Sequence, residues 1–185
     1  MAAKLGIVAG SGPLPGRLVE LCRQSGREVF VVALEGHTDP ATVDDVPHLW
    51  TRLGAAGSAL AALRAAGVGE LVMVGPVRRP SLRELRPDLR TAQVLSRIGA
   101  AGLGDDGLLR ALVGVLEGEG FRVVGVDDVI ADLRAPEGPY GRHHPDARAR
   151  ADIDRGIAVA CALGAADVGQ AVVVQEGIVL GVEAV

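Results

Sequence analysis

The sequence predicts an α/β protein with a parallel sheet that is covered by helices on both faces. Short apolar, β-branched runs alternate along the chain with alanine- and leucine-rich segments of helical spacing, a pattern typical of βαβ units. The strongest run, "EVFVVALEG", is apolar throughout, as a strand covered on both faces requires. Glycines directly follow two of the runs, at Gly10 and at Gly75, where a parallel sheet places its ligand-binding turns.

The first half of the chain contains the expected βαβ units. We expect strands at 4–9, 28–36 and 70–77, a short strand within 46–54, and helices at 14–26 and 58–67. The first helix closes at Gly26, a residue type common just past a helix C-terminus. This order predicts a Rossmann-like sheet.

The middle of the chain is expected to be mostly helical. Residues 78–120 carry this pattern, broken by Pro80 and Pro87, and residues 121–130 read as a further strand. Apolar residues at helical spacing predict one buried helix face formed by Leu108, Leu109, Leu112, Val115 and Leu116.

A polar stretch rich in proline and glycine, residues 134–150, is the best linker candidate. Beyond it we expect a helix at 151–164 and two strands joined by a hairpin turn at Glu176-Gly177. We therefore divide the chain into a Rossmann-like domain, 1–133, and a segment, 134–185, of linker, helix and terminal β-hairpin. Because the last strand ends without a cap, we expect this segment to lead into a second domain outside these residues.

Composition argues against nucleic-acid binding. Aromatic residues make up 2% of the 185 residues and the formal net charge is −4, so the chain has neither stacking platforms nor an excess of positive charge. Cys22 and Cys161 lie far apart in helical segments without a CxxC motif, which predicts buried free thiols and a reducing, cytoplasmic compartment. No apolar run reaches the ~18 residues that a membrane-spanning helix needs.

The stretch "KLGIVAGSGPLPGRLVE" reads as a strand, a glycine turn and a helix start. A helix N-terminus with unpaired N–H groups favours an anion such as phosphate. Pro13 and Pro15 cannot donate a hydrogen bond but suit the first turn of a helix, and Pro15 stands where a dinucleotide fingerprint has its last glycine. The N–H groups expected to face a ligand are those of Gly10, Ser11, Gly12 and Leu14.

Glu35 follows the second strand at the place where a dinucleotide-binding protein holds a ribose. The same residue is equally explained as the first polar residue after a strand. An NAD(P)-binding oxidoreductase domain therefore remains an alternative, as does a nucleotide-binding or interaction module without catalysis.

Two more loops carry charge where ligands bind. Arg78 and Arg79 follow the strand that ends near Val74, and guanidinium groups suit a diphosphate; a solvated basic loop is the alternative. Asp105 and Asp106 stand at a helix start, where capping explains one carboxylate, and the other is free for a ribose or a divalent ion.

The remaining polar motifs do not identify a catalytic nucleophile. His143-His144 lies in a Pro/Gly-rich loop without spaced carboxylates or cysteines, so we do not expect a metal there. His37 and His48 are isolated and are expected to be structural.

Taken together, four motifs resemble the LpxI-type UDP-2,3-diacylglucosamine pyrophosphatases. They occur in the family's order as "KLGIVAGSGPLP", "VGPVRRPSL", "GDDGLLR" and "ADIDRGIAVACALGAADVGQAVVVQEGIVLGVEA" and extend from Lys4 to Ala184. The segment containing "DVGQAVVVQEG" is the most specific, whereas the glycine loop alone is a weak signal.

The resemblance implies a hydrolase of lipid A synthesis that acts in the cytoplasm or at the membrane surface. Such enzymes cleave UDP-2,3-diacylglucosamine to UMP and lipid X with a divalent metal, Mg²⁺ or Mn²⁺, and hold the substrate between two domains. The resemblance also implies a catalytic aspartate in a C-terminal segment that this chain does not contain. We therefore expect the chain to bind the uridine nucleotide side without turnover, to associate peripherally with the membrane and to be compatible with a homodimer.

The family's loops map onto three segments of this sequence, from which we infer the substrate contacts. These contacts are Gly10, Ser11, Gly12, Leu14 and Pro15 in the first loop, Val77, Arg78 and Arg79 in the second, and Gly104, Asp105 and Asp106 in the third. No catalytic residue and no metal ligand is assigned within the chain.

Overall fold

The structure is a computed structural model that describes residues 3–78, 85–98, 105–130 and 135–183. The chain divides into two compact units, one comprising residues 1–97 and 112–134 and the other residues 98–111 and 135–185. The boundary expected at 133/134 stays a prediction. Each unit is described by itself.

The first unit is built on a five-stranded parallel sheet. Its strands are β1 (Leu5–Ala9), β2 (Val29–Leu34), β3 (His48–Thr51), β4 (Glu70–Val74) and β5 (Arg122–Val123). They lie in the order β3-β2-β1-β4-β5, and every neighbouring pair is parallel. This order matches the first five strands of a Rossmann-type doubly wound sheet, which confirms the expected α/β fold.

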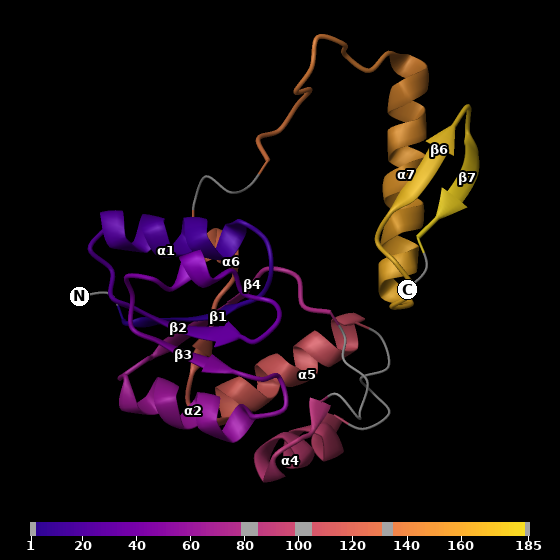
Figure 1. Cartoon of the computed structure of the whole chain (residues 1–185). Coiled ribbons are helices and arrows are strands. Elements are labelled where there is room, and N and C mark those ends of the chain that lie inside the picture. The colour runs from indigo at the N-terminus through magenta and orange to yellow at the C-terminus, as the bar shows by residue number, and fades with distance from the viewer. Residues whose placement is uncertain (1–2, 79–84, 99–104, 131–134, 184–185) are drawn as a thin grey trace. The chain divides into compact units, whose positions relative to one another are not determined.

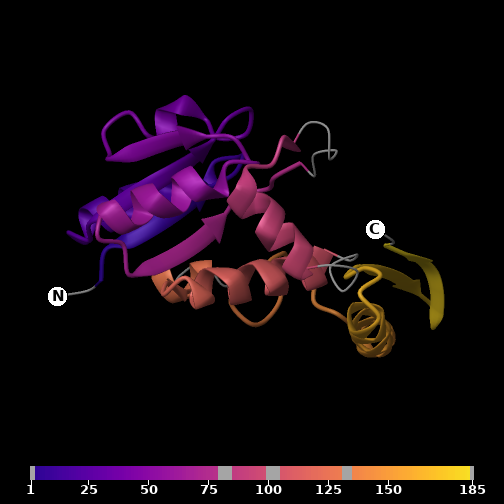
Figure 2. The same ribbon diagram turned by 90° about the horizontal axis from the view of Figure 1, so that it is seen from below.

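Helices cover both faces of this sheet. Helix α1 lies over one face together with the short α6, and α2 and the C-terminal half of α5 lie over the other (Figures 1 and 2). The elements outside the sheet are α1 (Leu14–Gln24), a 3₁₀ turn η1 (Pro40–Thr42), α2 (Ala56–Ala65), α4 (Leu89–Ile98), α5 (Asp105–Gly118) and α6 (Val126–Val129).

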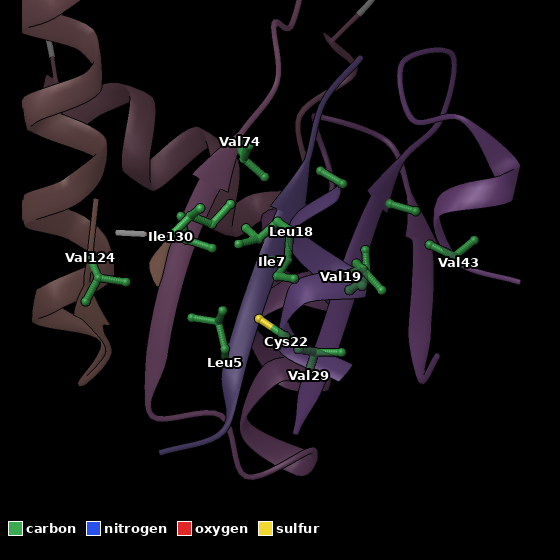
Figure 3. Close-up of a cluster of buried hydrophobic side chains, with 14 residues drawn as sticks. Leu5, Ile7, Leu18, Val19, Cys22, Val29, Val43, Val74, Val124 and Ile130 are labelled. Atoms are coloured by element: carbon green, nitrogen blue, oxygen red, sulfur yellow. The ribbon is translucent and has the colours of Figure 1, made fainter. Parts of the chain in front are cut away.

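Apolar side chains on alternating strand positions form two cores, one on each face. On the α1 face, Leu5 and Ile7 of β1 pack with Leu18 and Cys22 of α1 (Figure 3). On the other face, the core contains Val32, Leu60, Leu63, Val68, Leu71, Leu116 and Phe121. Each large side chain buried in this way stabilises the fold by about 1.5–3 kcal/mol, which is why the strands contain so few polar residues.

The expected strand at 121–130 is wrong beyond its first residues. Only Arg122–Val123 pairs in the sheet, and the chain then turns into α6. The Asp128 carboxylate accepts a hydrogen bond from the Gly125 N–H at 2.9 Å, which caps the N-terminus of this helix. Local capping therefore prevails over the apolar pattern.

Two expectations about buried side chains also need correction. Cys22 is buried as expected, whereas Cys161 is exposed. Leu109 is 52% exposed and so does not belong to the buried face expected on α5, although Leu116 does. Periodicity identifies one face of a helix but not how much of that face another element covers.

In the second unit, a two-stranded antiparallel hairpin packs against one helix. The unit contains α7 (Ala147–Ala165), β6 (Val172–Gln175) and β7 (Ile178–Val182). The Asp146 side chain caps α7 by accepting the Ala149 N–H at 2.8 Å, so the helix begins at Ala147, inside the expected linker. No helix in the described residues is long and apolar enough to cross a membrane.

The hairpin turn lies where the sequence predicts it. Glu176 and Gly177 both adopt positive φ angles, 54° and 75°, as the two central residues of a tight hairpin turn do. The Asp152 carboxylate of α7 accepts the N–H groups of both residues, at 2.8 and 2.6 Å. The helix therefore fixes the tip of the hairpin.

Candidate functional site

The sheet order creates a switch point between β1 and β4. The chain leaves β1 through α1 towards β2, while β4 pairs with the other edge of β1. In open parallel sheets, ligands bind outside the carboxyl ends of the strands at such a point. The glycine loop after β1 and the loop after β4 both begin there.

Backbone hydrogen bonds join these two loops. The Gly10 N–H donates to the Val74 carbonyl oxygen at 2.8 Å, and the Ser11 N–H donates to the Pro76 carbonyl oxygen at 2.9 Å. The loops therefore form one structure, although Gly10 and Val74 are 64 positions apart in the sequence.

The loops touch so closely that neither tolerates a side chain at the contact. A Cβ atom on Gly10 would overlap the carbonyl oxygens of Gly75 and Pro76. A Cβ atom on Gly75, whose φ is +90°, would meet the Ser11 carbonyl oxygen and come within 3.0 Å of Cγ of Pro15. Pro15, which interrupts the dinucleotide fingerprint, thus packs beside the glycine of the other loop.

A buried threonine holds the end of β1 from the opposite side. Oγ1 of Thr38, in the loop after β2, donates to the Ala9 carbonyl oxygen at 2.5 Å and accepts the Leu34 N–H at 2.7 Å. Thr38 is 6% exposed. The carboxyl end of β1 is therefore fixed by the loops of both neighbouring strands.

These contacts decide which N–H groups of the glycine loop can meet a ligand. Those of Gly10 and Ser11, expected to face a ligand, are used between the loops. Across the described residues, no hydrogen-bond acceptor pairs with the N–H groups of Gly12, Leu14 and Gly16. These three lie in or next to the first turn of α1, where an anion is favoured by the helix dipole.

The second expected loop lies at the same edge of the sheet. Val77, 40% exposed, and Arg78, also exposed, lie in the loop after β4, beyond Gly75 and Pro76. Arg79 lies outside the described residues. The structure thus brings the glycine loop and the start of the "VGPVRRP" loop together, as the sequence predicted for the carboxyl ends of parallel strands.

The third expected loop belongs to the second unit. Asp105 and Asp106 are the first residues of α5; their side chains, and Gly104, lie outside what the structure describes. In the same first turn, the Gly107 N–H donates to Oδ2 of Asp167 at 3.3 Å. Asp167 is therefore one carboxylate that serves this helix start.

The polar residues near β2 and β3 make local contacts. Glu35 is exposed at the carboxyl end of β2, and its N–H donates to the Thr51 carbonyl oxygen at 2.9 Å. One ring nitrogen of His37 lies 3.1 Å from the Glu35 carbonyl oxygen, and one of His48 lies 2.8 Å from the Val46 carbonyl oxygen. Both histidines thus take part in local contacts with the backbone.

The described side chains do not supply a metal site. Among them, no three histidine, cysteine, aspartate or glutamate side chains gather in a way that could hold an ion. His143 and His144 are exposed. The expected divalent metal therefore has no ligands assigned in the described parts of the chain.

A cluster of ion pairs lies at the opposite end of the sheet, where the strands begin. Arg27 and Arg122 both donate to the Glu70 carboxylate, whose side chain is 15% exposed. The hydrogen bond from Arg122, helped by the one from Arg27 and opposed by burial, holds the pKa of Glu70 below its ordinary value. This cluster ties β4 and β5 to the turn before β2 and does not take part in the site.

Comparison with known proteins assigns the chain to a protein family. Residues 4–133 match the family model described as the LpxI N-terminal domain, and residues 136–185 match the one described as the LpxI C-terminal domain. The chain belongs to the LpxI family. It is 41% identical over 182 residues to the UDP-2,3-diacylglucosamine pyrophosphatase LpxI of Caulobacter vibrioides, covering 98% of this chain and 65% of that relative.

Among solved structures, similarity to this LpxI-family chain is distant. Bordetella bronchiseptica WbmG in complex with NAD gives a TM-score of 0.44 at 15% identity, over 68% of this chain and 37% of that one. Stenotrophomonas maltophila UDP-glucose 4-epimerase, with bound NAD and formylated UDP-arabinopyranose, gives 0.45 at 13% identity, over 88% and 50%. Similarity at this level does not extend to function.

The family assignment changes the interpretation of residues 134–185. The sequence alone predicts a linker, a helix and a hairpin here that precede an absent domain. Residues 136–185 instead match the model of the LpxI C-terminal domain itself. The chain spans about 65% of the length of its Caulobacter relative.

Two features that shape the site were not predicted from the sequence: the contact of Gly75 with the glycine loop, and the role of Thr38. Gly75 directly follows an apolar strand, and this position signals a turn but not which segment the turn contacts. Thr38 gives no signal at all, because its two hydrogen bonds depend on the pairing of β1 with β2.

Proposed function

We propose that this chain is the nucleotide-binding part of a UDP-2,3-diacylglucosamine pyrophosphatase, which releases UMP and lipid X in lipid A biosynthesis. The observation that carries the proposal is the 41% identity, over 98% of the chain, to a relative that bears this name. The switch-point geometry supports the same conclusion, because it offers an anion site at the carboxyl edge of a parallel sheet.

In this proposal the uridine diphosphate group binds at the start of α1. The N–H groups of Gly12, Leu14 and Gly16 donate to phosphate oxygens, and the helix dipole adds favourable potential. Arg78, in the loop after β4, supplies positive charge to the same group. The remaining positions inferred as contacts are Gly10, Ser11 and Pro15, which shape the loop, and Val77, Arg79, Gly104, Asp105 and Asp106.

The proposed reaction is attack of water on a phosphorus of the diphosphate, with UMP among the products. Negative charge grows on the phosphate oxygens as the bond breaks, and fixed N–H groups and a guanidinium stabilise such charge. We propose Mg²⁺ or Mn²⁺ as cofactor from the family resemblance alone. No step is assigned to the metal, because the described side chains hold no ligand set.

We further propose that the catalytic aspartate lies in the C-terminal domain, outside the motifs named above, and that these 185 residues bind the nucleotide without hydrolysing the substrate. A hydrolysis assay of the chain with UDP-2,3-diacylglucosamine and Mg²⁺ tests this. UMP release above the metal-free background would refute it. Action in the cytoplasm, peripheral membrane binding and a homodimer belong to the same proposal. Vesicle sedimentation tests the membrane binding, and the mass in solution tests the homodimer.

The binding claim is tested by thermal unfolding of the chain with UMP, UDP or NAD. A ligand present at 100 times its Kd stabilises the folded state by about 2.7 kcal/mol, so UMP and UDP are expected to raise the melting temperature. NAD is the discriminating control. A rise with NAD but not with UMP would favour the oxidoreductase alternative based on Glu35, and no response to any nucleotide at millimolar concentration would reject the proposed binding.

A further inference from the structure

The contact between the loops after β1 and β4 has a consequence for how the nucleotide site is built. The N–H groups of Gly10 and Ser11 donate hydrogen bonds to the carbonyl oxygens of Val74 and Pro76, respectively. Those bonds require the two backbones to approach so closely that a Cβ atom on Gly75 would meet Gly10, Ser11 and Pro15. The contact exists because position 75 has no side chain.

The approach also sets the direction of α1. Pro15 is buried in the first turn of α1, and its Cγ lies 3.0 Å from the place that a Cβ of Gly75 would occupy. Pushing this ring away would move the first turn of the helix. That turn carries the N–H groups of Leu14 and Gly16, which are without a partner in the described residues.

We propose that Gly75 is a positioning residue of the nucleotide site. It holds the glycine loop against β4 so that the N–H groups of Gly12, Leu14 and Gly16 converge on one phosphate group of the ligand. Gly75 does not touch the ligand. This inference rests on the function proposed above and adds to it the residue that determines the geometry of the phosphate contacts.

The role is tested with Gly75→Ala and a matched control, Gly120→Ala. Gly120 has a φ of +93°, nearly that of Gly75 at +90°, but nothing lies within 4 Å of the place of its Cβ. Both variants therefore carry the same backbone strain, and only Gly75→Ala adds the clash between the loops.

Titration calorimetry with UMP measures the effect on the folded variants. Gly120→Ala is expected to bind UMP as the unmodified chain does, and Gly75→Ala about tenfold more weakly or worse, the loss expected when a charged ligand gives up one hydrogen bond. Gly10→Ala, which adds the clash from the other loop, is expected to share the defect. Equal UMP affinity for folded Gly75→Ala and Gly120→Ala would overturn the inference.

A measurement on the unmodified chain covers the case in which Gly75→Ala does not fold. In amide hydrogen exchange without ligand, Gly10 and Ser11 are expected to be protected like β1, and Gly12, Leu14 and Gly16 to exchange quickly until UMP protects them. Fast exchange at Gly10 and Ser11 would contradict the loop contact itself. Protected Gly10 and Ser11 in a chain that binds no uridine nucleotide would instead reject the proposed function, and with it the role of Gly75 there.

Discussion

Glu119 shows how one carboxylate orders several helices of the first unit. Its side chain is 9% exposed and accepts hydrogen bonds from Arg64 of α2 and Arg90 of α4. The hydrogen bond from Arg64, helped by the charge of Arg90 and opposed by burial, holds the pKa of Glu119 below its ordinary value of 4.5. The end of α5 is therefore tied to two other helices by a group that must stay ionised.

This pKa shift predicts how stability depends on pH. A carboxyl group whose pKa is lower in the folded state contributes stability above the unfolded-state value, and that contribution is lost as the pH falls through the folded-state pKa. Glu119→Gln is therefore expected to lower the free energy of unfolding at neutral pH, by about 1 kcal/mol for partners this exposed, and to lose this effect progressively as the pH falls below 4.5.

Urea unfolding at neutral pH, where the contribution is complete, and at a series of pH values below 4.5, where it is lost, checks this expectation. Glu117→Gln is the matched control, because Glu117 is exposed in the last turn of α5, two residues before Glu119, and its side chain has no partner among the described residues. Identical stability curves for the two variants would show that Glu119 contributes nothing through its charge.

Single residues were predictable where their role is local. The Glu176-Gly177 turn follows from residue type and spacing. The N–H groups of Gly10 and Ser11 were assigned to a ligand, because the sequence does not show that the loop after β4 accepts them. The exposure of Cys161 escaped prediction for the same reason, since helix periodicity says nothing of what covers a face.

At the scale of elements, the hairpin and α7 form a small assembly held at its tip. Side chains of β6 alternate, with Val172 and Val174 half-buried and Val173 61% exposed. Cγ atoms of Val172 and Val174 lie 3.6 Å from the position that a Cβ atom on Gly156 of α7 would occupy. The strand therefore packs against the helix at a residue without a side chain. A two-stranded sheet is only marginally stable alone and depends on such support.

The Asp152 carboxylate provides a second attachment of the hairpin to α7. Asp152→Ala removes the acceptor of the Glu176 and Gly177 N–H groups and is expected to lower hydrogen-exchange protection across β6 and β7 about tenfold, because one such bond contributes roughly 1.4 kcal/mol.

Asp154→Ala serves as the control for this experiment. Asp154 lies on the same helix, is exposed and makes no hydrogen bond or ion pair to the described residues. If both variants leave the hairpin equally protected, the contact with Asp152 does not stabilise the turn.

Elements with strong patterns were predictable, and short ones were not. The apolar runs at β1, β2 and β4 predicted buried parallel strands, and the structure confirms them. The run at 121–130 predicted a strand, yet Gly125 and Asp128 form a helix cap within it. Asp127 and Asp128 interrupt the apolar run, and the Asp128 carboxylate caps a helix start there instead.

At the scale of the whole chain, the sequence motifs predicted the family and the structure supplies the site's geometry. The four motifs correspond to matches with both LpxI domains. The sheet order brings the first two motifs together at the β1–β4 switch point. The third motif begins α5 in the second unit, so its part in binding stays a prediction.

Binding of the nucleotide by the glycine loop is tested most directly by an NMR titration of the ¹⁵N-labelled chain with UMP. We expect the amide signals of Gly12, Leu14 and Gly16 to shift most, while Gly10 and Ser11 keep their protection from exchange. Millimolar UMP that leaves these three amides unmoved, or that shifts only residues of the second unit, would contradict the claim that the glycine loop of this LpxI-family chain binds the nucleotide.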